Sequence, residues 1–189
     1  FQEKQNGTGH AVQVGLKEIA NDFKDGIVYV LPGDMGLLDD SSMVKFREDF
    51  ISSGDDMMVL TGIYDGDPLL NSYGRIIRVK SKDSKSVSAG NDEGNVIQIM
   101  EFKDILALPD DKPYQVAYRN KTYSYTKIEL IETNEFNSGV YAFNYKKLME
   151  LINNLSSNNA QNEIYITDLI SLFNQKGYSV GAVSPTNQY

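Results

Sequence analysis

The stretch at residues 26–38, GIVYVLPGDMGLL, organises the rest of the chain. It opens with an unbroken apolar and aromatic run at residues 27–31, and such a run is typical of a strand that is covered on both faces. Pro32 and Gly33 then end the run, because proline has no backbone donor and glycine permits unusual dihedral angles. The pattern therefore predicts a strand within a sheet that carries helices on both faces.

Asp34 follows this predicted strand directly, at its carboxyl end. In open α/β sheets this edge is where ligands bind, and a carboxylate there suits Mg²⁺ that carries a phosphorylated substrate. A turn-capping role explains an Asp after Pro-Gly equally well. On this stretch alone, both roles for Asp34 stay open.

The composition is that of an ordinary globular protein with an acidic balance. The chain has 189 residues, of which 41% are hydrophobic and 23% charged, and its net charge is −8. This length fits one domain with a sizeable core. The negative charge argues against a nucleic-acid backbone or an anionic membrane surface as a partner.

Several kinds of site are excluded by residue types that the sequence lacks. There is no Cys, which rules out a disulfide framework and a thiolate zinc site within these residues. The single His, His10, has no G-x-S-x-G elbow to accompany it, so we interpret it as an ordinary first-turn helix residue. No apolar run is long enough to span a membrane and no signal-peptide pattern is present, so we expect a cytoplasmic protein.

Hydrophobic periodicity predicts interleaved helices and strands. We expect helices at residues 12–23, 39–53, 145–155 and 166–173, and strands at residues 26–31, 57–63, 73–80, 95–100, 135–144 and 178–183. The polar segment 82–94 indicates a mobile hairpin loop, and residues 103–127 an irregular insertion. The tyrosines of that insertion either stack on a ligand or, more commonly, pack. Arg75 and Arg78 are expected to form solvated salt bridges.

Six segments, taken together in this order and spacing, go beyond composition. They are QEKQNGTGHAV (2–12), VLPGDMGLL (30–38), YGRIIR (73–78), IMEFKDI (99–105), EFNSGVYAF (135–143) and NNAQNEIYITDLI (158–170). Together they resemble the uridylyltransferase domain of the bacterial bifunctional enzymes that make UDP-N-acetylglucosamine. The resemblance covers most of the chain, except for the loops at 82–94 and 106–127.

The resemblance implies a three-layer, Rossmann-like nucleotidyltransferase fold with a mixed, mainly parallel sheet. Residues 1–189 would form a single, partial domain that lacks its first β-α units. The implied reaction is the Mg²⁺-dependent joining of UTP and N-acetylglucosamine 1-phosphate, with release of pyrophosphate. Such chemistry depends on positioning and charge neutralisation more than on a nucleophilic side chain.

The resemblance also implies roles at the nucleotide end of the site. Asp34 matches the catalytic carboxylate that binds Mg²⁺, and Gly33 beside it matches a nucleotide contact with backbone access. Gln2, Gly7 and Thr8 match the residues that hold the uracil and ribose. An amide side chain suits a base edge, and glycine allows close approach.

At the sugar end, Gly74, Glu101 and Asn137 match contacts to the acetylated sugar. A carboxylate and an amide are suitable partners for hydroxyls and an N-acetyl group. Taken singly, the same residues also suit a strand-end glycine, a solvated Glu and an Asn in a turn. Inside the matching motifs we favour the binding roles.

The chain departs from this family in three respects. Relatives begin with a Gly-rich loop that carries an Arg and a Lys and cradles the triphosphate, and no such loop precedes Phe1. Their second metal ligand, an Asn after the last strand, would lie beyond Tyr189. Pro32 stands where relatives often carry Tyr. We therefore keep two alternatives: a sugar-1-phosphate nucleotidyltransferase of other specificity, and a non-catalytic module that binds a sugar nucleotide.

Overall fold

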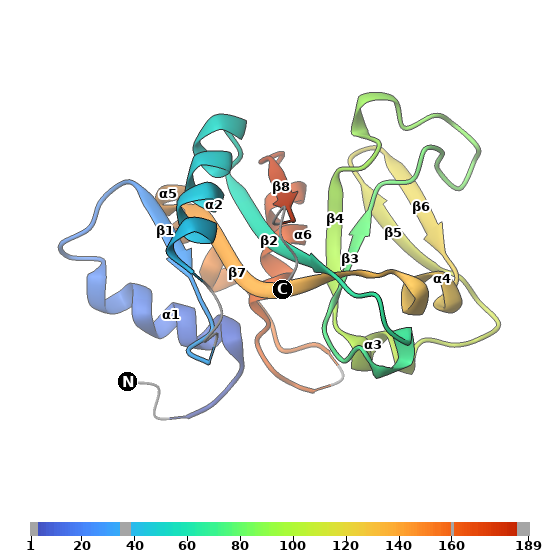
Figure 1. The fold of residues 1–189 in the computed structure, drawn as a ribbon, viewed down its shortest axis with the longest axis horizontal. Coiled ribbons are helices and arrows are strands. Elements are labelled where there is room, and N and C mark those ends of the chain that lie inside the picture. The colour runs from blue at the N-terminus through green and yellow to red at the C-terminus, as the bar shows by residue number, and fades with distance from the viewer. Residues whose placement is uncertain (1–3, 35–38, 160, 185–189) are drawn as a thin grey trace.

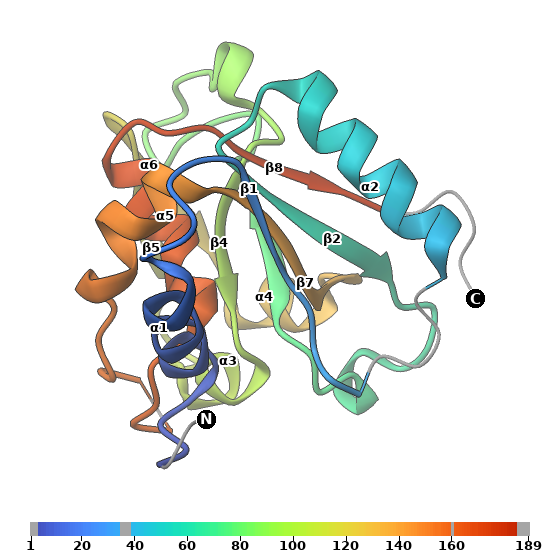
Figure 2. The same cartoon turned by 90° about the vertical axis from the view of Figure 1, so that its left-hand side faces the viewer.

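A mixed sheet with helices on both faces forms the body of the protein (Figures 1 and 2). The computed structural model describes residues 4–34, 39–159 and 161–184. Strand order in the main sheet is β4-β3-β7-β2-β8, and β1 pairs with β7 outside this path. The strands are β1 (Ile27–Val30), β2 (Met57–Ile63), β3 (Arg75–Arg78), β4 (Val96–Met100), β7 (Glu135–Asn144) and β8 (Val180–Val183). A separate hairpin joins β5 (Tyr114–Tyr118) to β6 (Lys121–Tyr125).

The helices follow the hydrophobic periodicity and the capping residues. They are α1 (Thr8–Ile19), α2 (Asp40–Ser53), α3 (Phe102–Ala107), α4 (Lys127–Glu132), α5 (Tyr145–Leu151) and α6 (Leu169–Gln175). The clearest example is α2, where the Asp39 side chain accepts a 2.7 Å hydrogen bond from the Ser42 amide and left-handed Gly54 ends the helix. No helix in the described ranges is both long enough and apolar enough to cross a membrane.

Side-chain alternation along β2 divides the core into two layers. Met57 and Val59 face a cluster formed with α1, α5 and α6, whereas Met58 and Leu60 face Phe46 and Phe50 of α2. Figure 2 shows α2 on one side of the sheet and α1, α5 and α6 on the opposite side. The strand predicted at residues 26–31 is β1, whose Val28 and Val30 pack against the first of these clusters and whose Ile27 and Tyr29 pack against the second, all of them partly buried. Its coverage on both faces, within a three-layer α/β fold, is therefore confirmed.

Strand β7 determines the direction of most pairings. It runs antiparallel to β1, β2 and β3, and β3 runs antiparallel to β4. Among the strand pairs that the structure describes in this sheet, only β2 and β8 are parallel. The sheet is mixed as predicted, but its pairings are mainly antiparallel rather than parallel. Hydrophobic runs identify buried strands without specifying direction, which explains the difference.

The segment at 103–127 is regular, which corrects the prediction of an irregular insertion. It contains most of α3 and the β5–β6 hairpin, with α4 following at once. The period-2 pattern was present in Tyr114, Val116 and Tyr118 and again in Tyr123 and Tyr125, but tyrosine is a weak marker of burial. The expected packing role is confirmed for Tyr118, Tyr123 and Tyr125, which are buried in one cluster.

Candidate functional site

Two strands share one edge of β7 and leave a gap between them. Strand β1 ends with Val30 opposite Tyr141, and β3 begins with Arg75 opposite Phe136, while β2 pairs along the other edge of β7. Because β1 and β3 run in the same direction, the carboxyl end of β1 points toward the amino end of β3 across residues 138–140. The carboxyl ends of strands are where α/β sheets commonly bind ligands, and β1 ends at this gap.

A cleft of about 940 Å³ lies at this gap. Its walls come from the start of α1, the end of β1, the last residues of β2, residues 72–74, β7 and the 3₁₀ turn Ile166–Asp168. Small-molecule sites typically have volumes of about 300–1,000 Å³, so the cleft is large enough for a nucleotide or a sugar phosphate. Segments from both ends of the described chain therefore build one cavity.

The cleft brings together five of the residues that the sequence singled out: Thr8, Asp34, Gly74, Glu101 and Asn137. Gly33 precedes Asp34 at the rim, where it is exposed. Gly7 lies just behind the cleft wall, next to Ile164. Gln2 lies outside the described residues. The fold therefore places Thr8, Asp34, Gly74, Glu101 and Asn137 in one cleft. The binding roles of all the residues that the sequence singled out stay predictions.

Of the three residues predicted to contact a sugar, Gly74 lies next to both Asn137 and Glu101. The Asn137 amide donates a 2.9 Å hydrogen bond to the Gly74 carbonyl, and the Asn137 side-chain nitrogen donates to the Tyr141 hydroxyl at 2.7 Å. A Cβ at position 74 would lie 3.2 Å from Oε2 of Glu101 and 2.9 Å from Cγ2 of Ile99. A side chain there would therefore push against the Glu101 carboxyl.

Glu101 occupies a poorly solvated part of the cleft. Burial raises the pKa of its carboxyl, the Thr167 hydroxyl 3.4 Å from Oε1 lowers that pKa, and Asp104 and Asp168 raise it again. Burial, and then repulsion from Asp104, also raises the pKa of Asp168 to about 6. The surroundings of both carboxyls therefore disfavour the charged form relative to water.

The glycine-rich start of α1 is hydrogen-bonded to the segment before α6. The Gly9 amide donates to the Ile164 carbonyl at 2.7 Å, and the Ile166 amide donates to Oγ1 of Thr8 at 3.1 Å. Gly7 has a φ of 101°, and a Cβ there would lie 2.6 Å from the Ile164 carbonyl oxygen. Two of the six resembling segments, far apart in sequence, therefore form one wall of the cleft.

Asp34 is an exposed carboxylate at the mouth of the cleft. The described part of the chain contains no group of three or more His, Cys, Asp and Glu side chains that would hold a metal. Mg²⁺ commonly keeps several waters and binds one or two carboxylates together with substrate phosphates. Asp34 fits that mode of binding and does not fit a preformed metal cage.

Tyr141 and Thr167 are among the polar residues of the cleft that sequence reasoning did not single out. Tyr141 is four residues after Asn137 in the same strand, too far for contact in a regular strand, and the hydrogen bond between them spans the irregularity that includes left-handed Gly139. Thr167 belongs to the segment NNAQNEIYITDLI, but nothing in its local pattern distinguishes it from a helix-capping residue. Its contact with Glu101 depends on tertiary structure.

Comparisons with known proteins identify the family of the chain. A family model described as nucleotidyl transferase matches residues 1–189. The bifunctional protein GlmU of Clostridium novyi (strain NT) is 35% identical over 185 residues, which cover 97% of this chain and 32% of that protein. The GlmU of Corynebacterium aurimucosum is 34% identical over 181 residues, which cover 96% of this chain and 29% of the relative. The chain thus spans about a third of the length of these curated relatives.

A solved structure supports the fold. The nucleoside-diphosphate-sugar pyrophosphorylase from Vibrio cholerae RC9 superimposes with a TM-score of 0.51 at 16% sequence identity. The match covers 96% of this chain and 59% of that one. At this identity the similarity establishes the shared α/β architecture and leaves the substrate unspecified.

Proposed function

The chain belongs to the nucleotidyl transferase family, and from that premise we propose that it is the catalytic part of a sugar-1-phosphate uridylyltransferase. The proposed substrates are UTP and N-acetylglucosamine 1-phosphate, and the products are UDP-N-acetylglucosamine and pyrophosphate. An oxygen of the sugar phosphate attacks the α-phosphorus of UTP. The bond between that phosphorus and the oxygen bridging to the β-phosphate breaks, and the oxygen leaves with pyrophosphate.

One observation carries the proposal: Thr8, Asp34, Gly74, Glu101 and Asn137 come from separate segments and line the same cleft. Their exposure distinguishes two kinds of environment. Thr8 and Asp34 are exposed, whereas Gly74 is buried and Glu101 and Asn137 are partly buried. Exposed residues suit charged phosphates in water, and more enclosed residues suit selection of sugar substituents.

Asp34 would hold Mg²⁺ together with the phosphates of the substrates. When bound, the ion would neutralise phosphate charge as the new bond forms. Asn137 would be held by the Tyr141 hydroxyl, and by the Gly139 amide that donates to its side-chain oxygen at 3.0 Å, so that its second side-chain N–H is left for the sugar. Glu101, next to Gly74, would also bind the sugar, with Thr167 restraining its carboxyl.

One contact, between Pro32 and Gly139, favours a second candidate function with a different substrate specificity. Pro32 lies against Gly139, where a Cβ would be 2.8 Å from Cγ of Pro32, and Gly139 has a φ of 84°. A rigid proline ring therefore fills this corner where relatives often carry Tyr. The second candidate is accordingly a sugar-1-phosphate nucleotidyltransferase that uses another base or another sugar.

The test is pyrophosphate release by the full-length protein with Mg²⁺, UTP or another nucleoside triphosphate, and a panel of sugar 1-phosphates. We expect the largest kcat/KM with UTP and N-acetylglucosamine 1-phosphate. Asp34→Asn should reduce kcat by at least about 100-fold, because charge stabilisation commonly supplies several kcal/mol. Asp40→Asn, which removes another exposed carboxylate six residues further along, should leave the rate unchanged.

The outcomes separate the alternatives. Preference for a different sugar or base would select the second candidate. Binding of a sugar nucleotide without pyrophosphate release would contradict catalysis and identify a non-catalytic module. We place the proposed reaction in the cytoplasm, with small charged substrates and with neither nucleic acid nor membrane as a partner.

A further inference from the structure

Arg75 is the first side chain of β3 after the cleft residue Gly74, and it is completely buried, with 0% exposure. The sequence led us to expect a solvated surface salt bridge at this position, and that prediction is wrong. Arg78, three residues further along the same strand, does form an ion pair, with Nε 2.6 Å from Oε2 of Glu135. The two arginines of one strand therefore have different roles.

The guanidinium of Arg75 is surrounded by backbone carbonyls. Its Nη2 donates to Pro68 O at 2.8 Å and to Asn71 O at 2.9 Å, and its Nη1 donates to Tyr73 O. Its Nε donates to Ile131 O at 3.4 Å, at the end of α4. The planar group also lies over the Phe102 ring, 4.9 Å from the ring centroid. Three of the four acceptors belong to one short loop, residues 68–73.

That loop continues directly into the cleft wall. Ser72, Tyr73 and Gly74 line the cavity, and the Tyr73 ring stacks on Phe136 with centroids 5.0 Å apart. The Gly74 carbonyl accepts from the Asn137 amide. The position of residues 72–74 therefore decides where Tyr73, Gly74 and Asn137 meet a ligand.

Little apolar burial holds this loop in place. Leu69, Leu70 and Tyr73 are 61%, 75% and 57% exposed. The side-chain caps of the loop are local: Asp67 accepts from the Leu69 amide and Asn71 from the Tyr73 amide. Because a buried polar group must be hydrogen-bonded, the loop carbonyls and the guanidinium hold each other in one arrangement.

We propose that Arg75 is a positioning residue that sets the wall at residues 72–74 and thereby the affinity for the sugar 1-phosphate. The inference rests on the proposed function for the identity of the ligand. The guanidinium acts through the loop and does not touch the substrate. Lysine cannot replace it, because an ammonium presents its donors from one point and lacks the planar fork that reaches several carbonyls at once.

The first measurement compares steady-state kinetics of Arg75→Lys and Arg78→Lys in the full-length protein. For Arg75→Lys, we expect KM for the sugar 1-phosphate to rise about tenfold or more, because a small displacement of a substrate-contacting wall is costly. KM for the nucleoside triphosphate should stay within about twofold, because Thr8 and Asp34 belong to segments that Arg75 does not hold. Arg78→Lys should leave both KM values unchanged. Equal changes in both KM values for Arg75→Lys, or none, would overturn the inference.

A milder variant covers the case in which Arg75→Lys does not fold. Phe102→Leu retains the hydrogen bonds of Arg75 and removes the ring on which its guanidinium lies. The same selective rise in KM for the sugar 1-phosphate is expected, with a smaller amplitude. An unchanged KM in a folded Phe102→Leu protein, together with an unfolded Arg75→Lys protein, would reduce Arg75 to a purely structural role.

Amide hydrogen exchange tests the inference without turnover. The amides of Leu70, Asn71, Tyr73 and Asn137 are hydrogen-bonded within or against the loop. In the folded variants their exchange should be faster than in the wild type, with β7 residues 141–143 unaffected. Absence of turnover in the wild type with every substrate pair would contradict the proposed function alone. Unchanged exchange at these amides would contradict the positioning role of Arg75.

Discussion

The protein contains two regions that fill their interiors with different side chains. The helical region, made of β1, β2, β7, β8 and helices α1, α2, α5 and α6, uses mainly aliphatic residues and phenylalanine, with Tyr141 and Tyr145 among them. The hairpin region, made of β3–β6 with α3 and α4, adds three buried tyrosines to its aliphatic residues, and the hydroxyls of Tyr118 and Tyr125 are hydrogen-bonded. The candidate site lies where the two regions meet, so both kinds of packing contribute to its geometry.

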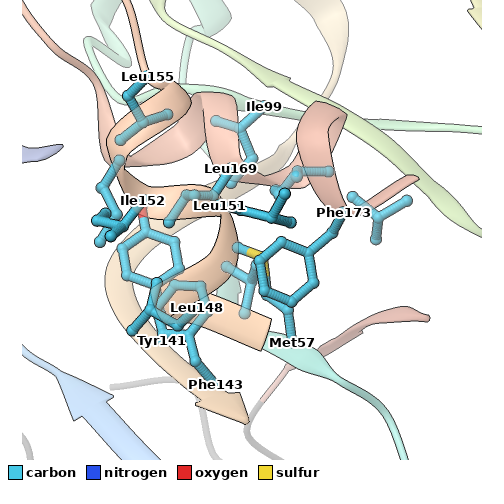
Figure 3. Packing of buried hydrophobic residues seen from close by; sticks show 14 of the residues in the cluster. Met57, Ile99, Tyr141, Phe143, Leu148, Leu151, Ile152, Leu155, Leu169 and Phe173 are labelled. Atoms are coloured by element: carbon cyan, nitrogen blue, oxygen red, sulfur yellow. The ribbon is translucent and has the colours of Figure 1, made fainter. Parts of the chain in front are cut away.

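In the helical region the main core is continuous and largely non-polar (Figure 3). Phe143 and Phe173 are fully buried and their ring centroids lie 6.0 Å apart. Leu148 and Leu169 complete the contact between α5, α6 and the sheet. Burial of this kind is non-directional, and its contribution scales with the area removed from water.

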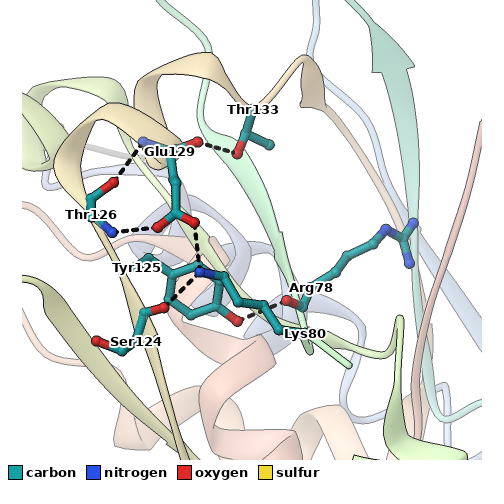
Figure 4. A network of polar contacts seen from close by, with 7 residues as sticks. All are labelled: Arg78, Lys80, Ser124, Tyr125, Thr126, Glu129 and Thr133. Atoms are coloured by element: carbon teal, nitrogen blue, oxygen red, sulfur yellow. Dashed lines mark hydrogen bonds and ion pairs between the residues drawn. The ribbon is translucent and has the colours of Figure 1, made fainter. Parts of the chain in front are cut away.

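The hairpin region depends on directed polar contacts as well (Figure 4). The Tyr125 hydroxyl donates to Arg78 O at 2.8 Å. Lys80 donates to Ser124 O and to Oε1 of Glu129, both at 2.8 Å, and its ammonium lies 4.5 Å from the centroid of the Tyr125 ring. Thr126 and Glu129 form a reciprocal capping box at the start of α4.

The largest expected effect is in the helical region. Phe173→Ala should lower the free energy of unfolding by about 3–5 kcal/mol, because it removes a fully buried ring and leaves a cavity. Denaturant unfolding followed by circular dichroism measures the loss. Ile51→Ala is the control and should have a small effect, because Ile51, on α2, is 53% exposed. A similar loss for both variants would contradict the assignment of the main core.

The difference between the regions explains how far sequence reasoning reached. Continuous apolar runs such as residues 57–63 and the capping signal at Asp39 predict β2 and α2 nearly to the residue. In the hairpin region, Tyr114–Tyr118 is a strand whose inward residues are tyrosines and valine. Tyrosine is common at surfaces as well as in cores, so the same period-2 signal was weaker there.

Candidate site residues could be predicted where a local sequence pattern was enough to single them out. Asp34 and Asn137 were identified from a strand end and a recognisable segment. The buried Arg75 was not, because its burial depends on three carbonyls of the 68–73 loop and a fourth from α4, which only the folded structure brings together. Likewise the gap between β1 and β3 depends on strand direction, which hydrophobic patterns do not encode.

A smaller effect is expected from single hydroxyls in the hairpin region. Tyr125→Phe should lower the free energy of unfolding by about 1–2 kcal/mol, because it removes the hydrogen bond to Arg78 O and leaves that carbonyl without this donor. Tyr123→Phe is a matched control in the same strand. Its hydroxyl is buried without a hydrogen-bond partner among the described residues, so its removal should be neutral or slightly stabilising. The two variants are compared by chemical denaturation at pH 7.

These two tyrosines sharpen the contrast with Phe173 because both rings stay in place. If Tyr123→Phe were as destabilising as Tyr125→Phe, ring packing would account for the hairpin region and its hydroxyls would contribute nothing specific. The regions would then differ only in composition. A loss confined to Tyr125→Phe would instead establish that directed hydrogen bonds stabilise this region.

The smallest expected effect lies at the boundary of the two regions and depends on pH. Asp168 is partly buried directly before α6, and burial followed by repulsion from Asp104 raises its pKa from 3.8 to about 6. The folded protein therefore binds this proton more tightly than the unfolded chain, and the wild type loses stability as the pH rises from about 4 to 6. Below about pH 4 the carboxyl is protonated in both states and the cost disappears.

Asp168→Asn removes the titrating group while keeping a side chain that is equally favourable at a helix N-terminus. At pH 7 it should raise the free energy of unfolding by about 1 kcal/mol or less, because solvent screens a carboxyl that is only partly buried. Near pH 4 the advantage should vanish. Unfolding curves of both proteins at pH 4, 5, 6 and 7 measure the difference. An advantage independent of pH would mean that the amide side chain packs better at this position. The charge of the Asp168 carboxylate would then contribute nothing to the stability of the boundary between the two regions.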